Sequence, residues 1–255
     1  MALQRELLGE ERRELILSWL GSEGKVLAAD LSGRLGVSLD TVRRDLHGLA
    51  DAGALRRVHG GALPPSPGPA RFVERREEDV DAKSAIAAAA VRLVEHGQVI
   101  ALSGGTTILE FARRLPDNLA ATVIATNPDI AVALADHPRL VVDVIGGRLH
   151  PDARTVTGPE AVDALRKVRP DVCVLSACSL HPAAGMTLRH REEALVVREM
   201  VGASGRILSL TTASKLGSAG PYPVASLERI DTLVTDAPEA EVLLYRELGI
   251  EVVQP

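Results

Sequence analysis

Aromatic side chains are scarce in this chain of 255 residues, which holds one Trp, two Tyr and two Phe. A buried core must therefore be built mostly from Val, Leu, Ile and Ala, and an apolar fraction of 46% is ample for one. Cysteine is equally rare, because Cys173 and Cys178 are the only two, and both lie in or beside an apolar run. This usage provides no cysteine spacing suited to a metal and predicts reduced, buried thiols in a cytoplasmic protein.

Long hydrophobic runs are also missing. No apolar stretch approaches the roughly 20 residues that a membrane-spanning helix needs. The first residues, "MALQRELLGEERREL", are charged throughout and lack the apolar centre of a signal peptide. We therefore expect no membrane partner and a cytoplasmic location.

The net charge of −5 argues against attraction of the whole chain to a polyanion, but the charge is unevenly distributed. Residues 1–61 carry nine basic and nine acidic side chains, so the whole net charge of −5 belongs to the residues that follow. Between residues 34 and 59, five arginines stand against three aspartates. The pattern indicates a small, locally basic part joined to an acidic one.

Proline marks the boundary between these parts. The stretch "PPSPGP", residues 64–69, cannot be helical and is typical of a linker. The sequence therefore predicts a head (residues 1–63), a linker (residues 64–80) and a body (residues 81–255).

Helical periodicity dominates the head. The stretches "RRELILSWL" and "VLAADLSGRLG" each place their apolar residues on one face, and Gly36 is expected to end the second helix. Ser38 is a suitable N-cap for a third helix. That helix would bury Val42, Leu46 and Leu49 on one side. Its opposite side then carries the polar residues Asp40, Arg43, Arg44 and His47.

A hairpin is predicted next, because "GALRRVHGGAL" contains two strand-like pieces around His59 and Gly60. Arg56 and Arg57 alternate in direction on its first strand, so we expect only one of them to face a ligand. A basic helix followed by a hairpin is typical of a winged helix-turn-helix that reads double-stranded DNA. The alternative is that the arginines merely solvate a small helical domain. The residues expected at DNA are Ser38, Asp40, Thr41, Arg43, Arg44, His47, Arg56, Arg57, His59 and Gly60.

In the body, short β-branched runs such as "QVIAL" and "ATVIAT" alternate with amphipathic segments such as "GPEAVDALRKV". This alternation predicts an α/β domain with a mainly parallel sheet covered on both faces. The strand order stays open.

The body also contains a candidate ligand site. In "IALSGGTTILEFA", a strand, a glycine-rich turn and a helix follow one another, which favours an anion, although a purely structural tight turn fits the motif as well. Polar or glycine-rich stretches follow three further strands, and Lys215 in one of them is a candidate phosphate contact. These elements could converge at the carboxyl edge of the sheet, provided that the strands before the glycine-rich turn and before Lys215 are adjacent. The residues expected at the effector are Ser103, Gly104, Gly105, Thr106, Thr107, Thr126, Asn127, Gly146, Gly147 and Lys215.

Several of these motifs together resemble the DeoR/GlpR family of bacterial transcriptional regulators. The similar stretches are "TVRRD" (41–45), "RVHGGA" (57–62), "GTT" (105–107) and "SKLG" (214–217). The resemblance implies a winged helix-turn-helix and a sensor domain like ribose-5-phosphate isomerase. It also implies a repressor that binds operator DNA and a phosphorylated effector, such as a sugar phosphate, and that forms a homodimer or homotetramer.

The sequence departs from this family at Ser103 and Thr212, where the family usually has Asp. A sugar-phosphate isomerase needs a positioned carboxylate, so we expect no catalytic residue. We also expect no cofactor, and no metal because metal-ligand spacing is absent. His150, His181 and His190 are expected to be surface residues. Two alternatives stay open, namely a regulator that senses no ligand, or an isomerase-like enzyme with a DNA-binding appendage.

Overall fold

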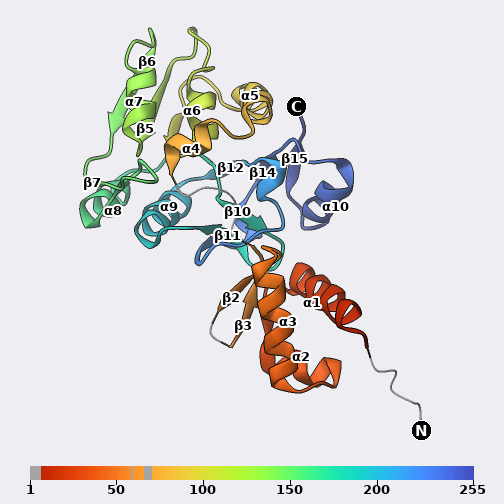
Figure 1. Ribbon diagram of the computed structural model, residues 1–255. Helices are drawn as coiled ribbons and strands as arrows, with labels where there is room; N and C mark the ends of the chain where they lie inside the picture. The colour runs from red at the N-terminus through yellow and green to blue at the C-terminus, as the bar shows by residue number, and fades with distance from the viewer. Residues whose placement is uncertain (1–6, 59, 66–70) are drawn as a thin grey trace.

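The computed structural model describes residues 7–58, 60–65 and 71–255, and it consists of a small head below a larger body (Figure 1). His59 and residues 66–70 of the predicted linker lie outside the described residues. The elements of the head are α1 (Gly9–Glu23), β1 (Val26–Leu27), α2 (Ala28–Leu35), α3 (Leu39–Asp51), β2 (Arg56–Val58) and β3 (Gly61–Leu63).

The head follows the predicted pattern closely. Ser38 caps α3, because its Oγ accepts the backbone N–H of Thr41 at 3.2 Å. Gly36 ends α2 with a φ of 65°, a conformation that favours glycine. The core of the head buries Ile16, Leu20, Leu31, Leu35, Val42, Leu46 and Leu49.

One detail of the head differs from the prediction. The second helix begins at Ala28 rather than at Val26, because Val26 and Leu27 form β1 and pair with β3. The small sheet therefore has the order β1-β3-β2. Leu27 was expected on the apolar face of the helix, but its side chain is 48% exposed.

The body is built on a seven-stranded sheet with the order β15-β14-β12-β9-β4-β5-β6. Each neighbouring pair in this sheet is parallel, as the alternating pattern predicted. Its strands are β4 (Val99–Leu102), β5 (Ala121–Ala125), β6 (Leu140–Val144), β9 (Val172–Leu175), β12 (Arg206–Leu210), β14 (Thr232–Val234) and β15 (Glu251–Val253).

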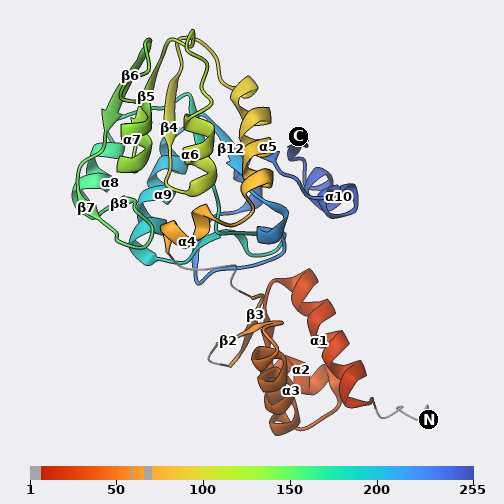
Figure 2. The same cartoon turned by 45° about the horizontal axis from the view of Figure 1, so that its top comes forward.

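Helices cover both faces of this sheet. One face packs against α5 (Val80–Ala90), α6 (Thr106–Ala112) and α7 (Pro128–Leu134), which lie side by side in Figure 2. The other face packs against α8 (Pro159–Leu165), α9 (Arg191–Ala203) and α10 (Glu239–Glu247).

Two small antiparallel sheets complete the body. One has the order β10-β11-β13, and the other pairs β7 with β8. Their bounds are β7 (Arg148–Leu149), β8 (Val156–Thr157), β10 (Ser179–His181), β11 (Gly185–Leu188) and β13 (Tyr222–Ala225).

Part of the predicted linker packs on the body. Residues 72–76 form α4 (Phe72–Arg76), and Phe72 is 1% exposed in the same apolar cluster as α5 and α6. The backbone N–H of Phe72 also donates to the carbonyl of Asp152 at 2.7 Å. The chain is therefore attached to the body from about residue 71 onward.

Candidate DNA-binding face and effector cavity

The predicted recognition helix α3 has its polar side open to solvent. Arg43, Arg44 and His47 are exposed, while Val42 and Leu46 on the opposite side are buried. Arg43 Nη1 forms an ion pair with Asp40 at 3.1 Å, with both side chains more than half exposed. An exposed pair of this kind contributes little to stability, so Arg43 can exchange its partner for a phosphate at small cost.

The wing separates its two arginines, as alternation predicted. Arg57 is exposed, and its Nη1 lies 2.8 Å from Nδ1 of His47, which joins the wing to α3. Arg56 points inward, with Nε and Nη2 buried. Gly60 lies in the turn of the wing with a φ of 82°, and its carbonyl accepts the N–H of Ala28 at 2.8 Å. Arg57 is therefore the wing arginine that can reach DNA.

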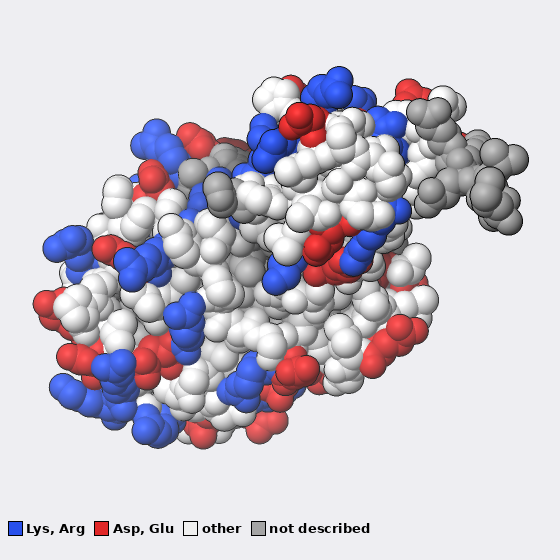
Figure 3. All heavy atoms as spheres, turned by 90° about the horizontal axis from the view of Figure 1, so that it is seen from below, with Lys and Arg blue, Asp and Glu red and all other residues white. Residues whose placement is uncertain are grey.

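Basic side chains lie along the outer edge of the head in Figure 3, with acidic side chains between them. Asp45 is not one of the exposed acids, because it is 4% exposed and accepts Arg12 Nε at 2.8 Å. The outward-facing charges of α3 therefore include Arg43 and Arg44 together with the exposed Asp40. The assignment of individual residues to DNA stays a prediction.

A cavity of about 330 Å³ lies at the carboxyl ends of β4, β9 and β12. Its lining includes Gly104, Gly105 and Thr106 after β4, Ser176 after β9 and Lys215 after β12. The expectation that the strands before the glycine-rich turn and before Lys215 are adjacent is wrong, because β9 lies between them. The two elements still meet, since all three parallel strands end at one edge of the sheet.

Glycine is required in the turn after β4. A Cβ on Gly104 would lie 2.0 Å from Oγ1 of Thr155, and Gly105 has a φ of 123°. The turn therefore brings bare backbone to the cavity wall. The helix that follows, α6, has only seven residues. The preference of the cavity for a ligand therefore depends mainly on the side chains that line it, rather than on the N-terminus of this helix.

Four cations line the cavity: Arg75, Lys83, Arg189 and Lys215. Lys215 Nζ lies 3.5 Å from Oγ of Ser176, and burial lowers its pKa. Burial and the nearby Lys215 likewise lower the pKa of Lys83, whose Nζ donates to the carbonyls of Arg75 and Glu78. Crowded, partly desolvated cations of this kind are stabilised by an anionic ligand.

Carboxylates lie beside these cations, and sequence reasoning missed them. Glu193, from the first turn of α9, is 7% exposed, and burial raises its pKa to about 7. Asp79 Oδ2 accepts the hydroxyl of Ser214 at 2.7 Å, and Glu78 also lines the cavity. The cavity therefore contains acids although Ser103 and Thr212 replace the two expected ones. Glutamates in "REEALVV" fit any helix start, so their local sequence carries no signal for this role.

Three of the remaining predicted effector residues, Ser103, Thr126 and Asn127, have structural partners instead. Ser103 Oγ donates to the carbonyl of Gly104, and Thr126 Oγ1 donates to the carbonyl of Leu102 at 3.2 Å. Asn127 caps α7, since its Oδ1 accepts the N–H of Asp129 at 2.8 Å. The residues that do not belong to the described lining of the cavity are Ser103, Thr107, Thr126, Asn127, Gly146 and Gly147.

Gly146 and Gly147 lie after β6, which is the edge strand of the sheet and is separated from β9 by β4 and β5, and this explains why they do not line the cavity. A Cβ on Gly147 would lie 2.7 Å from the carbonyl of Thr157, so glycine permits close packing there.

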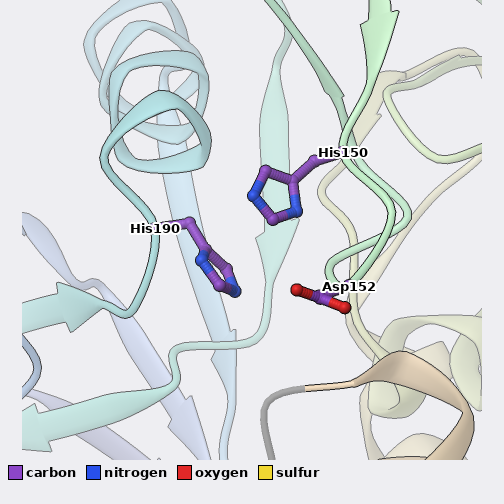
Figure 4. Close-up of side chains that lie close together, drawn as sticks. All are labelled: His150, Asp152 and His190. Carbon is purple, nitrogen blue, oxygen red and sulfur yellow. The ribbon is translucent and has the colours of Figure 1, made fainter.

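The histidines differ from the expected surface positions. His181 is fully buried in β10, because its ring packs where the body meets the head. His150 and His190 are half-buried with ring centroids 4.2 Å apart, and Asp152 lies beside them (Figure 4). The N–H of Ala153 donates to Nδ1 of His150 at 3.3 Å, so this trio would have to rearrange before it held a cation.

Comparison with known proteins identifies the two parts. Residues 12–67 match the family described as "DeoR-like helix-turn-helix domain", and residues 78–237 match "DeoR C terminal sensor domain". The chain is 32% identical over 232 residues to the HTH-type transcriptional regulator GlpR of Haloferax volcanii, covering 90% of each chain. It is 30% identical to a putative aga operon transcriptional repressor of Escherichia coli O157:H7, covering 95% of this chain and 93% of that one.

The chain belongs to the DeoR family of helix-turn-helix transcriptional regulators. Similar solved structures include ribose 5-phosphate isomerase A from Methanocaldococcus jannaschii, with 20% identity, a TM-score of 0.39 and 55% of each chain covered. Among the described helices, none has both the length and the apolar character required to cross a bilayer.

Proposed function

We propose that this protein is a repressor that binds operator DNA through α3 and the wing, and that a phosphorylated sugar in the cavity of the body controls this binding. The observation that carries the proposal is the cavity itself, where four cations and three carboxylates meet at the carboxyl edge of the sheet. Cations suit a phosphate, and carboxylates suit the hydroxyl groups of a sugar.

The open face of α3 supports the DNA half of the proposal. Arg43, Arg44 and Arg57 are exposed on α3 and on the adjacent wing, which is the arrangement that a winged helix-turn-helix uses. A single head buries little DNA, so we propose that the protein acts in the cytoplasm as a homodimer or homotetramer on a symmetric site.

The names of relatives support the sugar half. One relative is an L-fucose operon activator of Haemophilus influenzae, 29% identical over 227 residues. That name describes the relative, and for this chain the class of effector rests on the chemistry of the cavity.

In the described lining of the cavity, Glu193 favours the enzymatic alternative, because a carboxyl with a pKa of about 7 could transfer a proton. We assign it to hydroxyl recognition, since Ser103 and Thr212 stand where further strand-end acids would be expected. Incubation with pentose and hexose phosphates, followed by NMR of the sugars, tests this assignment. Turnover that is lost in Glu193→Gln would establish the enzymatic alternative instead.

The decisive experiment measures DNA affinity with and without sugar phosphates. Operator duplexes are selected from a random library, and fluorescence anisotropy then follows binding of the full chain. We expect one or more sugar phosphates to change the affinity. Lys215→Ala should abolish this response and keep DNA binding without ligand, whereas the exposed Lys167→Ala should change neither. A parent protein that responds to no sugar phosphate would contradict the proposal.

A further inference from the structure

The body touches the head at a buried histidine side chain. His181, the last residue of β10, is 0% exposed, and its ring packs against Gly24, the residue that ends α1. A Cβ on Gly24 would lie 3.0 Å from Cε1 and Nδ1 of His181 and 3.1 Å from Cβ of Ala183. The contact is therefore closely packed on both sides, and Figure 1 shows β10 and β11 at this boundary.

The orientation of the imidazole follows from its own turn. Nδ1 accepts the backbone N–H groups of Ala183 at 3.0 Å and Ala184 at 3.2 Å. The neutral ring must then carry its proton on Nε2. Burial lowers the pKa of His181, which favours the neutral ring, while the carbonyls of Gly21 and Leu20 act in the opposite direction.

Nε2 is the unusual atom in this contact. It is buried beside the last turn of α1 and makes no hydrogen bond in the structure, although the carbonyls of Leu20 and Gly21 lie near it. A buried donor without a partner is unfavourable, so a small shift of the hairpin that brings Nε2 within hydrogen-bond distance of one of these carbonyls would change the energy of docking. The contact is therefore sensitive to small movements of the hairpin.

The same strand is bonded to the loop that carries Lys215. Leu180, immediately before His181, pairs with Leu216, and its carbonyl accepts the N–H of Gly217 at 2.8 Å. Tyr245 Oη donates to the same carbonyl at 3.0 Å. Leu216 and Leu180 are therefore directly paired, and they are the immediate neighbours of Lys215 in the cavity and of His181 at the head.

We infer that β10 transmits occupancy of the cavity to the DNA-binding head, with His181 as the positioning residue at the contact. The inference rests on the proposed effector site. An anion that draws Lys215 toward it moves Leu216 and Gly217, and their bonds to Leu180 carry the movement to His181. The head then docks differently, so its DNA-binding face is held in a different position. Coupling of this kind requires only that the anion favours one of the two arrangements.

Hydrogen exchange on the full chain tests this route with inorganic phosphate as the probe. In the parent, phosphate should slow exchange in residues 213–217 and also change it in residues 20–24. In His181→Ala, the first effect should remain and the second should disappear. The variant should also exchange faster than the parent in residues 20–24 without phosphate, because the contact is gone.

A pair of glycine variants separates docking from backbone strain. Gly24→Ala places a methyl group against His181, whereas Gly53→Ala has the same kind of positive φ, 73°, with nothing within 4 Å of the new atom. We expect Gly24→Ala to lose the response of α1 to phosphate and Gly53→Ala to keep it. On DNA, phosphate should change the affinity of the parent by about fivefold or more, which is typical of such coupling. In Gly24→Ala and His181→Ala, phosphate should change the affinity by less than about twofold.

Each outcome decides a separate claim. Phosphate that protects residues 213–217 but leaves residues 20–24 unchanged in the parent overturns the coupling and retains the effector site. Phosphate that affects neither segment overturns the effector site. Exchange in residues 20–24 that is the same in His181→Ala and the parent overturns the docking contact, and circular dichroism of every variant identifies loss of folding.

Discussion

The head and the body of this protein both present charged groups to an anionic partner, but they hold those groups in opposite surroundings. On α3, the side chains of Arg43 and Asp40 are 60% and 80% exposed. In the cavity, Lys83 is 3% and Glu193 is 7% exposed. DNA is a large surface that must reach its contacts from outside, whereas a small metabolite can be enclosed. Burial in the body therefore shifts the pKa values of Lys83 and Glu193. The exposed charges of α3 remain in contact with solvent instead.

The largest effects should come from breaking the two cores separately. Leu31→Ala in the head and Ile100→Ala in the body each remove a side chain that is at most 1% exposed. We expect each to cost about 2–5 kcal/mol of unfolding free energy. Calorimetry should show that Leu31→Ala lowers only the head transition and Ile100→Ala only the body transition. A single transition that both variants lower equally would show that head and body unfold as one unit.

Replacement of Glu193 should have a smaller effect on the free energy of unfolding, and this effect should depend on pH. Its pKa rises from an ordinary 4.5 to about 7 in the folded protein. The unfolded chain therefore loses this proton at lower pH, so its contribution to stability is fullest below pH 4.5 and is lost as the pH rises to about 7. Glu193→Gln should remove this dependence and stabilise the body on the order of 1–3 kcal/mol at pH 8. Urea denaturation at several pH values checks this, with the exposed Glu247→Gln expected to behave as the parent.

The arginines of α3 should affect DNA binding while leaving stability nearly unchanged. An arginine that contacts a phosphate should, when replaced by alanine, reduce the slope of log affinity against log salt by about one unit. An arginine that reads a base should instead relax sequence preference, at a cost of about 1–3 kcal/mol. Arg43→Ala and Arg44→Ala are compared with the exposed Arg92→Ala of the body. Unchanged DNA binding in both head variants at several salt concentrations would refute the assignment of α3.

The smallest effect is expected from the cap of α3. Ser38→Ala removes the hydrogen bond to the N–H of Thr41 and should destabilise the head by about 1 kcal/mol. The head transition in calorimetry should move to lower temperature, while the response of the body to phosphate stays as in the parent. Ser38→Asp, which can also accept this hydrogen bond, should restore the stability of the head.

Local pattern was sufficient where neighbouring residues decide the structure. The spacing of Val42, Leu46 and Leu49 predicted the buried side of α3, and Ser38 and Gly36 predicted the helix ends around it. Gly104 and Gly105 were predicted in a turn between a strand and a helix, and they lie between β4 and α6. Each of these features depends on sterics and hydrogen bonds within a few residues, and the sequence contains them directly.

The sequence by itself determined the two folded parts, the parallel class of the sheet and the outward face of α3. Only the tertiary structure decided which distant residues meet. In the tertiary structure, β9 lies between β4 and β12, Glu193 of α9 lines the cavity, and His181 packs against Gly24. The physical reason is that strand order and helix docking are set by how whole apolar faces pack together. Glu193 and His181 acquire their burial, and with it their shifted pKa values, from elements far away along the chain.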